Sequence, residues 1–242
     1  MNMPPIVDSH ALLGREDHLE LSADGLLRRM DAHGIETAIA RPMGAALIVR
    51  NREGNDRLLE SGGRIRGMVS VNPWWGEEGV EELRRCRDLG GVGLYLNPAR
   101  QGFFPTDPLV EPLLELAGEF QWPVMFQTGA FVYADLLAVL ELTRSFPEIN
   151  FIAGFGGFAD MWFELPGVFE GASNLYLETS MIWAEAIRSI IETNGPSRVL
   201  YGSAEPRNRY AVSLGNFRRL GLEQNVLEAV LCDNARRIFR LS

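Results

Sequence analysis

Polar side chains stand at the ends of short apolar runs, where a parallel sheet would hold chemically active groups. The first run, "IVDSHALLG", carries Asp8 and His10, and two later runs end in Glu178 and Glu205. An imidazole beside carboxylates is a combination used for general acid–base catalysis near neutral pH. We therefore predict that His10 is a catalytic acid or base, or an anchor for a substrate carbonyl, and that Asp8 or Glu205 orients its ring. The alternative is a structural histidine that is hydrogen-bonded to the backbone at a strand end.

Glu178 and Glu205 follow runs that we expect to be neighbouring strands. Two carboxylates held close together can differ in pKa and so divide the roles of acid and base. The alternative is that one of them forms a salt bridge with Arg207 at the rim, and the sequence leaves both open. The residues predicted to bind a substrate at other strand ends are Tyr95, Asn97, Gln127 and Arg207.

The elements that would position these residues form a regular series. Eight apolar runs begin about 25 to 32 residues apart, close to the ~30 residues of a βαβ unit, and helical patterns separate them. Near-continuous apolar runs are typical of strands covered on both faces. We predict a single (β/α)8 TIM-barrel domain over residues 1–242, with active groups at its C-terminal mouth. An open doubly wound sheet is the rival, but no G-x-G-x-x-G follows the first run. The predicted strands are 5–10, 36–42, 65–72, 91–97, 123–129, 149–155, 174–180 and 199–205.

Composition excludes several classes of function. The chain has 242 residues and a formal net charge of −9, and all of its basic residues are arginines. The missing lysines rule out a lysine Schiff base and a P-loop, and the acidity disfavours nucleic acid and anionic membranes as partners. Two separate cysteines make no disulfide framework, and no apolar run reaches the ~18 residues of a membrane span. We expect a cytoplasmic protein whose partner is a small molecule.

Several fragments, in their order and spacing over nearly the whole chain, resemble one family. They are "IVDSHALLG", "GRIRGMVSVNP", "FPEINFIAGFGG", "RVLYGSAEP" and "DNARRIF". The resemblance is to the amidohydrolase-related barrels of the amidohydrolase 2 type, which are metal-dependent hydrolases and decarboxylases. It implies a divalent metal whose five ligand positions fall on His10, Leu12, Gln127, Gly154 and Ala204.

Of these five residues only His10 is a type that commonly binds zinc. The resemblance therefore implies a degenerate member, and we predict no metal and no cofactor. A rearranged metal site built from Asp8, His10 and Glu205 is the alternative.

Two functions remain. The first is a metal-independent enzyme acting on a small molecule, with hydrolase, lyase or acid–base cyclisation chemistry. The second is a catalytically inactive relative that binds a ligand or pairs with an active relative. We favour the enzyme because the predicted mouth keeps polar side chains. The sequence also leaves open whether the chain forms a homo-oligomer.

Overall fold

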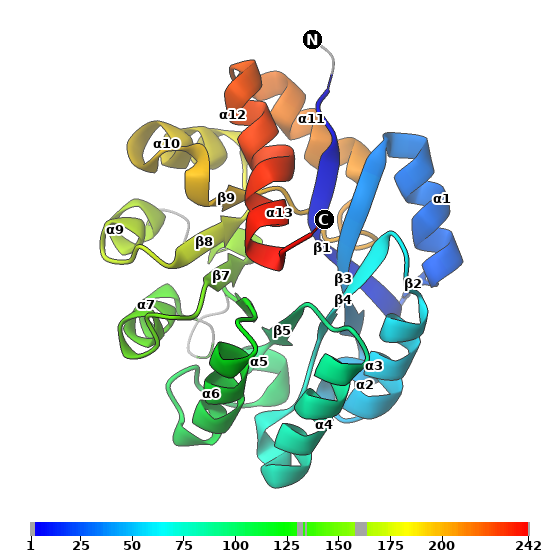
Figure 1. Ribbon diagram of the computed structural model, residues 1–242. Helices are drawn as coiled ribbons and strands as arrows, with labels where there is room; N and C mark the ends of the chain where they lie inside the picture. The colour runs from blue at the N-terminus through cyan, green and yellow to red at the C-terminus, as the bar shows by residue number, and fades with distance from the viewer. Residues whose placement is uncertain (1–2, 130–132, 134, 158–163, 242) are drawn as a thin grey trace.

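Strands and helices alternate along the chain and curl into a barrel (Figure 1). The computed structural model describes residues 3–129, 133, 135–157 and 164–241. The strands of these residues are β1 (Ile6–Glu16), β2 (Leu19–Leu21), β3 (Ile35–Met43), β4 (Ile65–Val69), β5 (Gly93–Leu96), β6 (Val124–Gln127), β7 (Phe151–Gly154), β8 (Leu175–Glu178) and β9 (Val199–Leu200). Each of the eight predicted runs overlaps one of them, although β1 and β3 extend beyond the predicted bounds of 5–10 and 36–42. The short strand β2, which forms a hairpin with the end of β1, was not predicted.

The strands form one sheet in the order β2-β1-β3-β4-β5-β6-β7-β8-β9, and all neighbours except β1 and β2 are parallel. Backbone hydrogen bonds join the first strand to the segment after β9: Ser9 N donates to Tyr201 O at 2.9 Å, and Ala204 N donates to His10 O at 2.7 Å. Beyond these bonds, an isolated parallel bridge pairs Ala11 with Glu205. The predicted (β/α)8 barrel is confirmed, and the open doubly wound alternative is wrong.

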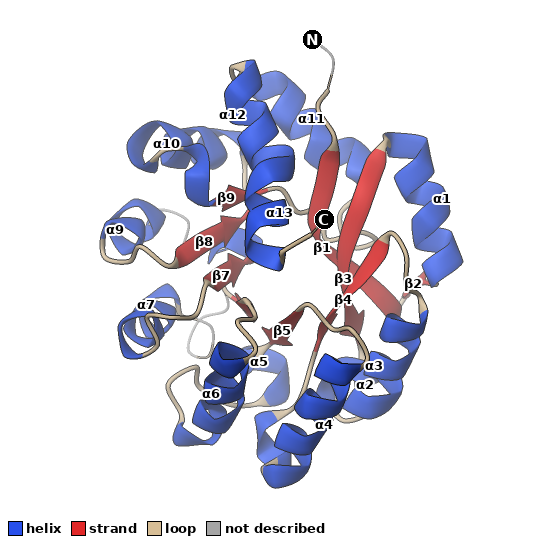
Figure 2. Cartoon of the chain, viewed as in Figure 1, coloured by secondary structure: helices blue, strands red, loops and turns tan. Residues whose placement is uncertain are grey.

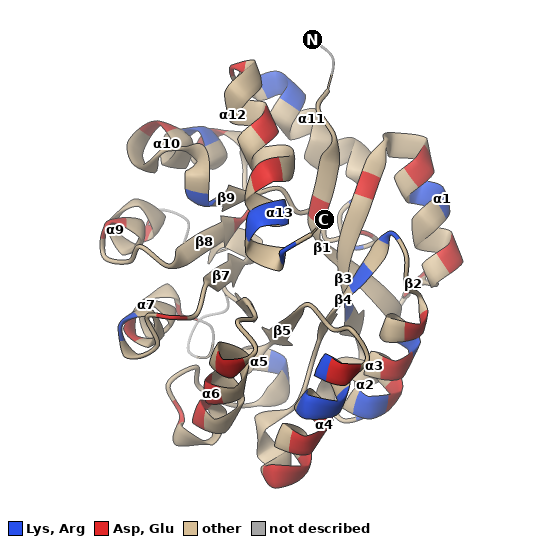
Figure 3. Cartoon of the chain, viewed as in Figure 1, with Lys and Arg blue, Asp and Glu red and all other residues tan. Residues whose placement is uncertain are grey.

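Helices cover the outside of the sheet (Figure 2). Their ends follow local chemistry: the side chain of Ser22 accepts a hydrogen bond from Gly25 N at the start of α1, and Gly34 ends that helix with φ 70°. Charged residues gather on this outer layer (Figure 3). Among the described residues, no helix is both long and apolar enough to cross a membrane. The helices are α1 (Ala23–His33), α2 (Ala45–Ile48), α3 (Asn51–Glu60), α4 (Glu77–Asp88), α5 (Pro98–Gln101), α6 (Glu111–Glu119), α7 (Leu136–Ser145), α9 (Leu165–Glu170), α10 (Ala184–Asn194), α11 (Tyr210–Leu220), α12 (Gln224–Glu228) and α13 (Asn234–Phe239).

The amino-terminal half of the barrel interior is filled by apolar side chains. Inward-facing residues of the strands form one cluster with residues of the C-terminal helical segment, and α13 lies across the barrel in Figure 1. This core leaves only the carboxyl ends of the strands for polar groups. The cluster contains Val7, Ile39, Leu47, Met68, Val92, Tyr95, Met125, Ile152, Tyr176, Leu200, Cys232, Ala235, Ile238 and Phe239.

Asp8 links the two edges that close the barrel. Its Oδ1 accepts hydrogen bonds from His10 N at 3.1 Å and Ser203 N at 2.9 Å. Its Oδ2 accepts from Ser203 Oγ at 2.6 Å and from the Tyr210 hydroxyl at 2.9 Å. Burial raises the pKa of Asp8 to about 6, because the cost of desolvating the carboxylate exceeds the effect of these donors. The predicted catalytic residue Asp8 therefore makes contacts that join β1 to the chain after β9.

We predict that Asp8 makes the fold less stable as the pH rises. The folded-state pKa of about 6 exceeds the ordinary value of 3.8, so the folded chain binds this proton more tightly. The resulting stability is present below about pH 3.8 and is lost as the pH rises through 6. It amounts to about 3 kcal/mol, since each tenfold change in proton affinity is worth about 1.4 kcal/mol.

The measurement is urea unfolding of the wild type and Asp8→Asn at pH 4.5 and pH 7.5. Relative to the variant, the wild type should lose most of that free energy between the two pH values. Because burial lowers the pKa of His10, that residue has the opposite pH dependence, but it is present in both proteins and cancels in the difference. A difference that does not vary with pH would contradict the prediction.

Candidate active site

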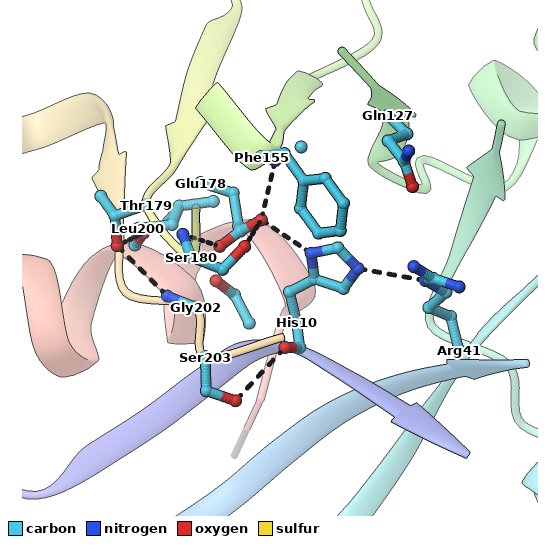
Figure 4. Close-up of polar contacts among 12 residues, drawn as sticks. His10, Arg41, Gln127, Phe155, Glu178, Thr179, Ser180, Leu200, Gly202 and Ser203 are labelled. Carbon is cyan, nitrogen blue, oxygen red and sulfur yellow. Dashed lines mark hydrogen bonds and ion pairs between the residues drawn. The ribbon is translucent and has the colours of Figure 1, made fainter. Parts of the chain in front are cut away.

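A row of three buried side chains crosses the carboxyl end of the barrel (Figure 4). His10 Nδ1 lies 2.7 Å from Glu178 Oε2 at the end of β8, and Arg41 Nε, from β3, donates to His10 Nε2 at 3.1 Å. We call Glu178, His10 and Arg41 the central row. These three residues are 0%, 1% and 3% exposed, respectively, so their contacts are made away from bulk water.

The two neighbours of His10 fix its protonation. Because a guanidinium can only donate, Nε2 must carry a lone pair, and Nδ1 must then carry the hydrogen that Glu178 accepts. Burial lowers the pKa of His10 and outweighs the opposite effect of Glu178, while the charge of Arg41 lowers it further. The ring is therefore a neutral imidazole whose basic nitrogen, Nε2, faces Arg41.

Glu178 is held in place by several donors. Its Oε1 accepts from Ser180 N at 2.6 Å, and its Oε2 accepts from Ser180 Oγ at 2.9 Å and Phe155 N at 3.0 Å. Gly202 packs so closely that a Cβ there would lie 1.9 Å from Glu178 Oε1. Glycine is therefore required at position 202 for the last strand to approach this carboxylate.

Two non-glycine residues beside the central row have left-handed backbone. Phe155 has φ 63° and Ala204 has φ 56°. The ring of Phe155 also stacks on His10, with centroids 5.1 Å apart and an interplanar angle of 29°. Such backbone is uncommon outside glycine and concentrates at functional sites, which favours a functional role for this part of the barrel.

Three predicted substrate-binding residues lie together in a group that we call the polar wall. The Tyr95 hydroxyl donates to Gln127 Oε1 at 2.6 Å, and Asn97 Nδ2 donates to the same oxygen at 2.9 Å. The Cζ atom of Arg41 lies 4.3 Å from the centre of the Tyr95 ring, within reach of a cation–π interaction. The polar wall thus borders the central row on the side of Arg41.

The prediction of which residue orients the His10 ring is wrong. Neither Asp8 nor Glu205 contacts the imidazole, because Glu178 takes that place. Glu205 instead pairs with Arg29 and accepts from Tyr210 N at 3.0 Å. The two glutamates of the predicted acid–base pair therefore bind different partners.

Arg207 does not form the expected rim salt bridge with either glutamate. Its Nη2 lies 3.1 Å from Glu16 Oε2. Arg41 was not among the predicted site residues. A single arginine in the apolar part of "ETAIARPM" is nevertheless unusual enough to indicate a buried charge with a specific partner.

The described residues do not fit a divalent metal at this place. They contain no group of three or more His, Cys, Asp or Glu side chains that could hold one. A Cβ on Gly154 would lie 3.0 Å from Met125 Cγ, so a histidine there would require repacking. His10 Nε2, the nitrogen with the free lone pair, is already bonded to the positively charged Arg41. The other positions implied by the resemblance hold Leu12, Gln127 and Ala204.

A family model described as "Amidohydrolase" matches residues 18–241. The chain belongs to the amidohydrolase family. The matched region covers the barrel from the β1–β2 turn onward and does not include His10. No curated protein sequence matches the chain.

Solved structures of similar fold include several decarboxylases. A 2,6-dihydroxybenzoate decarboxylase from Rhizobium has a TM-score of 0.82 and 20% identity, with 99% of each chain covered. A 5-carboxyvanillate decarboxylase from Novosphingobium aromaticivorans, complexed with manganese and 4-hydroxy-3-methoxy-5-nitrobenzoic acid, has a TM-score of 0.83 and 16% identity, covering 98% of this chain and 96% of that one. A dihydroxybenzoic acid decarboxylase from a Polaromonas species, with bound manganese and 2-nitroresorcinol, has a TM-score of 0.79 and 19% identity, covering 100% and 98%. At these identities the likeness establishes the fold.

We predict that the two neighbours of His10 shift its pKa in opposite directions. Arg41→Met removes a positive charge that lowers the pKa of His10, so that pKa should rise. Glu178→Gln removes a negative charge that raises it, so the pKa should fall.

Imidazole NMR spectra recorded as a function of pH would measure both changes. His10→Asn would assign the signal among the three histidines of the chain. The control is Arg64→Met, which removes an exposed arginine just before β4, at the amino end of the barrel. Shifts of the same sign in the Arg41 and Glu178 variants would refute the charge arrangement of the central row.

Proposed function

We propose that this barrel is a metal-independent enzyme of lyase type that acts on a small, preferably aromatic, carboxylic acid. The observation that carries the proposal is the central row, a neutral imidazole held by a buried carboxylate with its basic nitrogen facing a guanidinium. The printed names of similar structures, which are decarboxylases of aromatic acids, support the choice of substrate class. Metal independence is supported by the side chains of the site, because the described residues contain no group of three or more His, Cys, Asp or Glu that could hold a metal.

In this proposal Arg41 binds the substrate and His10 moves the proton. A guanidinium pairs well with anionic oxygens, so Arg41 would turn from His10 Nε2 toward an oxygen of the acid. The freed Nε2 takes one proton from solvent, and Glu178 stabilises the imidazolium that forms. His10 then donates this proton to the ring carbon that bears the carboxylate. The carbon–carbon bond breaks, its electron pair restores the aromatic ring, and carbon dioxide leaves.

The polar wall would orient the ring of the substrate. Tyr95, Asn97 and Gln127 offer hydroxyl and amide groups beside Arg41, suited to the phenolic hydroxyls of a dihydroxybenzoate. Because Gln127 Oε1 already accepts two hydrogen bonds, its amide nitrogen is the group left to donate to a ligand.

The test is an assay of carbon dioxide release from 2,6-dihydroxybenzoate and 5-carboxyvanillate by protein dialysed against a chelator. We expect turnover that added manganese does not increase. His10→Gln should lower kcat roughly 100-fold or more, the usual size of an acid–base contribution. The matched control is His18→Gln, since His18 lies exposed in the turn between β1 and β2.

Each failure has a distinct meaning. Activity that disappears with the chelator and returns with manganese would refute metal independence. Turnover of lactones alone would refute the substrate class. If no acid reacts, or if His10→Gln is as active as the wild type, the alternative of a catalytically inactive, ligand-binding barrel would replace this proposal.

A further inference from the structure

A second group of charges lies at the carboxyl end of the barrel. Glu16, the last residue of β1, is 6% exposed. Its Oε2 lies 3.1 Å from Arg207 Nη2, and its Oε1 pairs with Arg100 Nη2. Arg100 belongs to α5, directly after β5, and Arg207 follows β9. We call Glu16, Arg100 and Arg207 the Glu16 clamp.

The Glu16 clamp connects distant parts of the barrel wall. In the sheet, β5 is separated from β9 by β6, β7 and β8 on one side and by β4, β3 and β1 on the other. A carboxylate that binds arginines following β5 and β9 therefore spans the mouth.

The clamp is the more exposed of the two charged groups. The side chains of Arg100 and Arg207 are 37% and 34% exposed, whereas His10 and Arg41 are 1% and 3% exposed. All three clamp charges act on Arg41: Glu16 raises its pKa, and the two clamp arginines lower it. The Glu16 clamp and the central row are thus electrostatically coupled, with the clamp nearer to solvent.

Positive charge is in excess in this region. Arg100 and Arg207 pair with the single carboxylate of Glu16, while Arg41 bonds to His10 and to Pro42 O. The two nearby glutamates have other partners, because Glu178 is bonded to His10 and Glu205 is paired with Arg29. Guanidinium groups keep their charge at all physiological pH values and present a fork of donors that matches a carboxylate. The arrangement therefore suits a second, external carboxylate.

We infer that Glu16 acts as an internal carboxylate at a binding site for small carboxylic acids, and that an incoming acid exchanges with it on Arg100 and Arg207. Displacement of Glu16 opens the path from solvent to Arg41 and His10. This inference rests on the proposed function only for the class of ligand, and binding can be measured without any turnover.

The test is calorimetric binding of benzoate, with the uncharged benzamide as the ligand control. Glu16→Gln removes the competing charge and keeps the shape of the side chain, so benzoate should bind roughly fivefold more tightly, the size of one partly exposed ion pair. Arg207→Gln should weaken benzoate binding by fivefold or more. If the Arg207→Gln protein does not fold, Arg100→Gln is the second variant, with the same expected result. Benzamide affinity should change in none of them.

The matched control is Glu36→Gln, because Glu36 pairs with Arg236 at 2.5 Å at the amino end of the barrel. It should bind benzoate like the wild type. Unchanged or weaker binding by Glu16→Gln, or no benzoate binding by any folded variant, would overturn the inference. Tight benzoate binding without turnover of any acid would overturn the proposed function and leave this inference standing.

Discussion

The contact between Glu178 and His10 is the constraint on which the rest of the mouth depends. A carboxylate with no exposure to water is very costly unless donors surround it. The donors of Glu178 come from three parts of the barrel: the His10 ring on β1, Phe155 N after β7, and Ser180 just after β8. This one group therefore fixes the relative positions of strands that are far apart in sequence. The left-handed backbone of Phe155 and the close approach of Gly202 are local costs of that arrangement.

The same contact determines what chemistry the imidazole can do. With its Nδ1 hydrogen committed to Glu178, His10 can exchange protons only through Nε2, and that nitrogen faces Arg41. A guanidinium carries a permanent charge and donates directional hydrogen bonds. Unlike a divalent cation, it does not generate hydroxide from bound water. In the proposed mechanism the positive charge therefore orients an anion, and the proton transfer depends on His10.

The sequence predicted the scaffold well and the pairing of side chains poorly. Continuous apolar runs identify strands covered on both faces. In contrast, β2 was missed because it has only three residues, in which Glu20 separates Leu19 from Leu21. Residues that end neighbouring strands converge, so Tyr95 and Gln127 were correctly expected in one region. The partner of His10 could not be predicted, because β9 lies between β8 and β1 and the choice depends on which way each side chain points across the barrel. Arg41 was overlooked because the apolar pattern identifies a strand but does not show which charged residue within it is buried at the site.

The two charged groups of the mouth differ in how easily they can change partners. In the central row, full burial makes it costly to break the contact between His10 and Glu178, so the imidazole and the carboxylate are pre-organised before a ligand arrives. In the Glu16 clamp, the carboxylate is buried but its two arginines are about one-third exposed, so a ligand can reach the arginines from solvent. In our proposal an incoming acid exchanges with Glu16 on these arginines, while the geometry of His10 and Glu178 stays fixed. In this proposal the first binding of the acid and the proton transfer depend on different groups, the Glu16 clamp and the pair of His10 and Glu178. Arg41 is linked to both, because it donates to His10 and its pKa depends on the charges of the clamp.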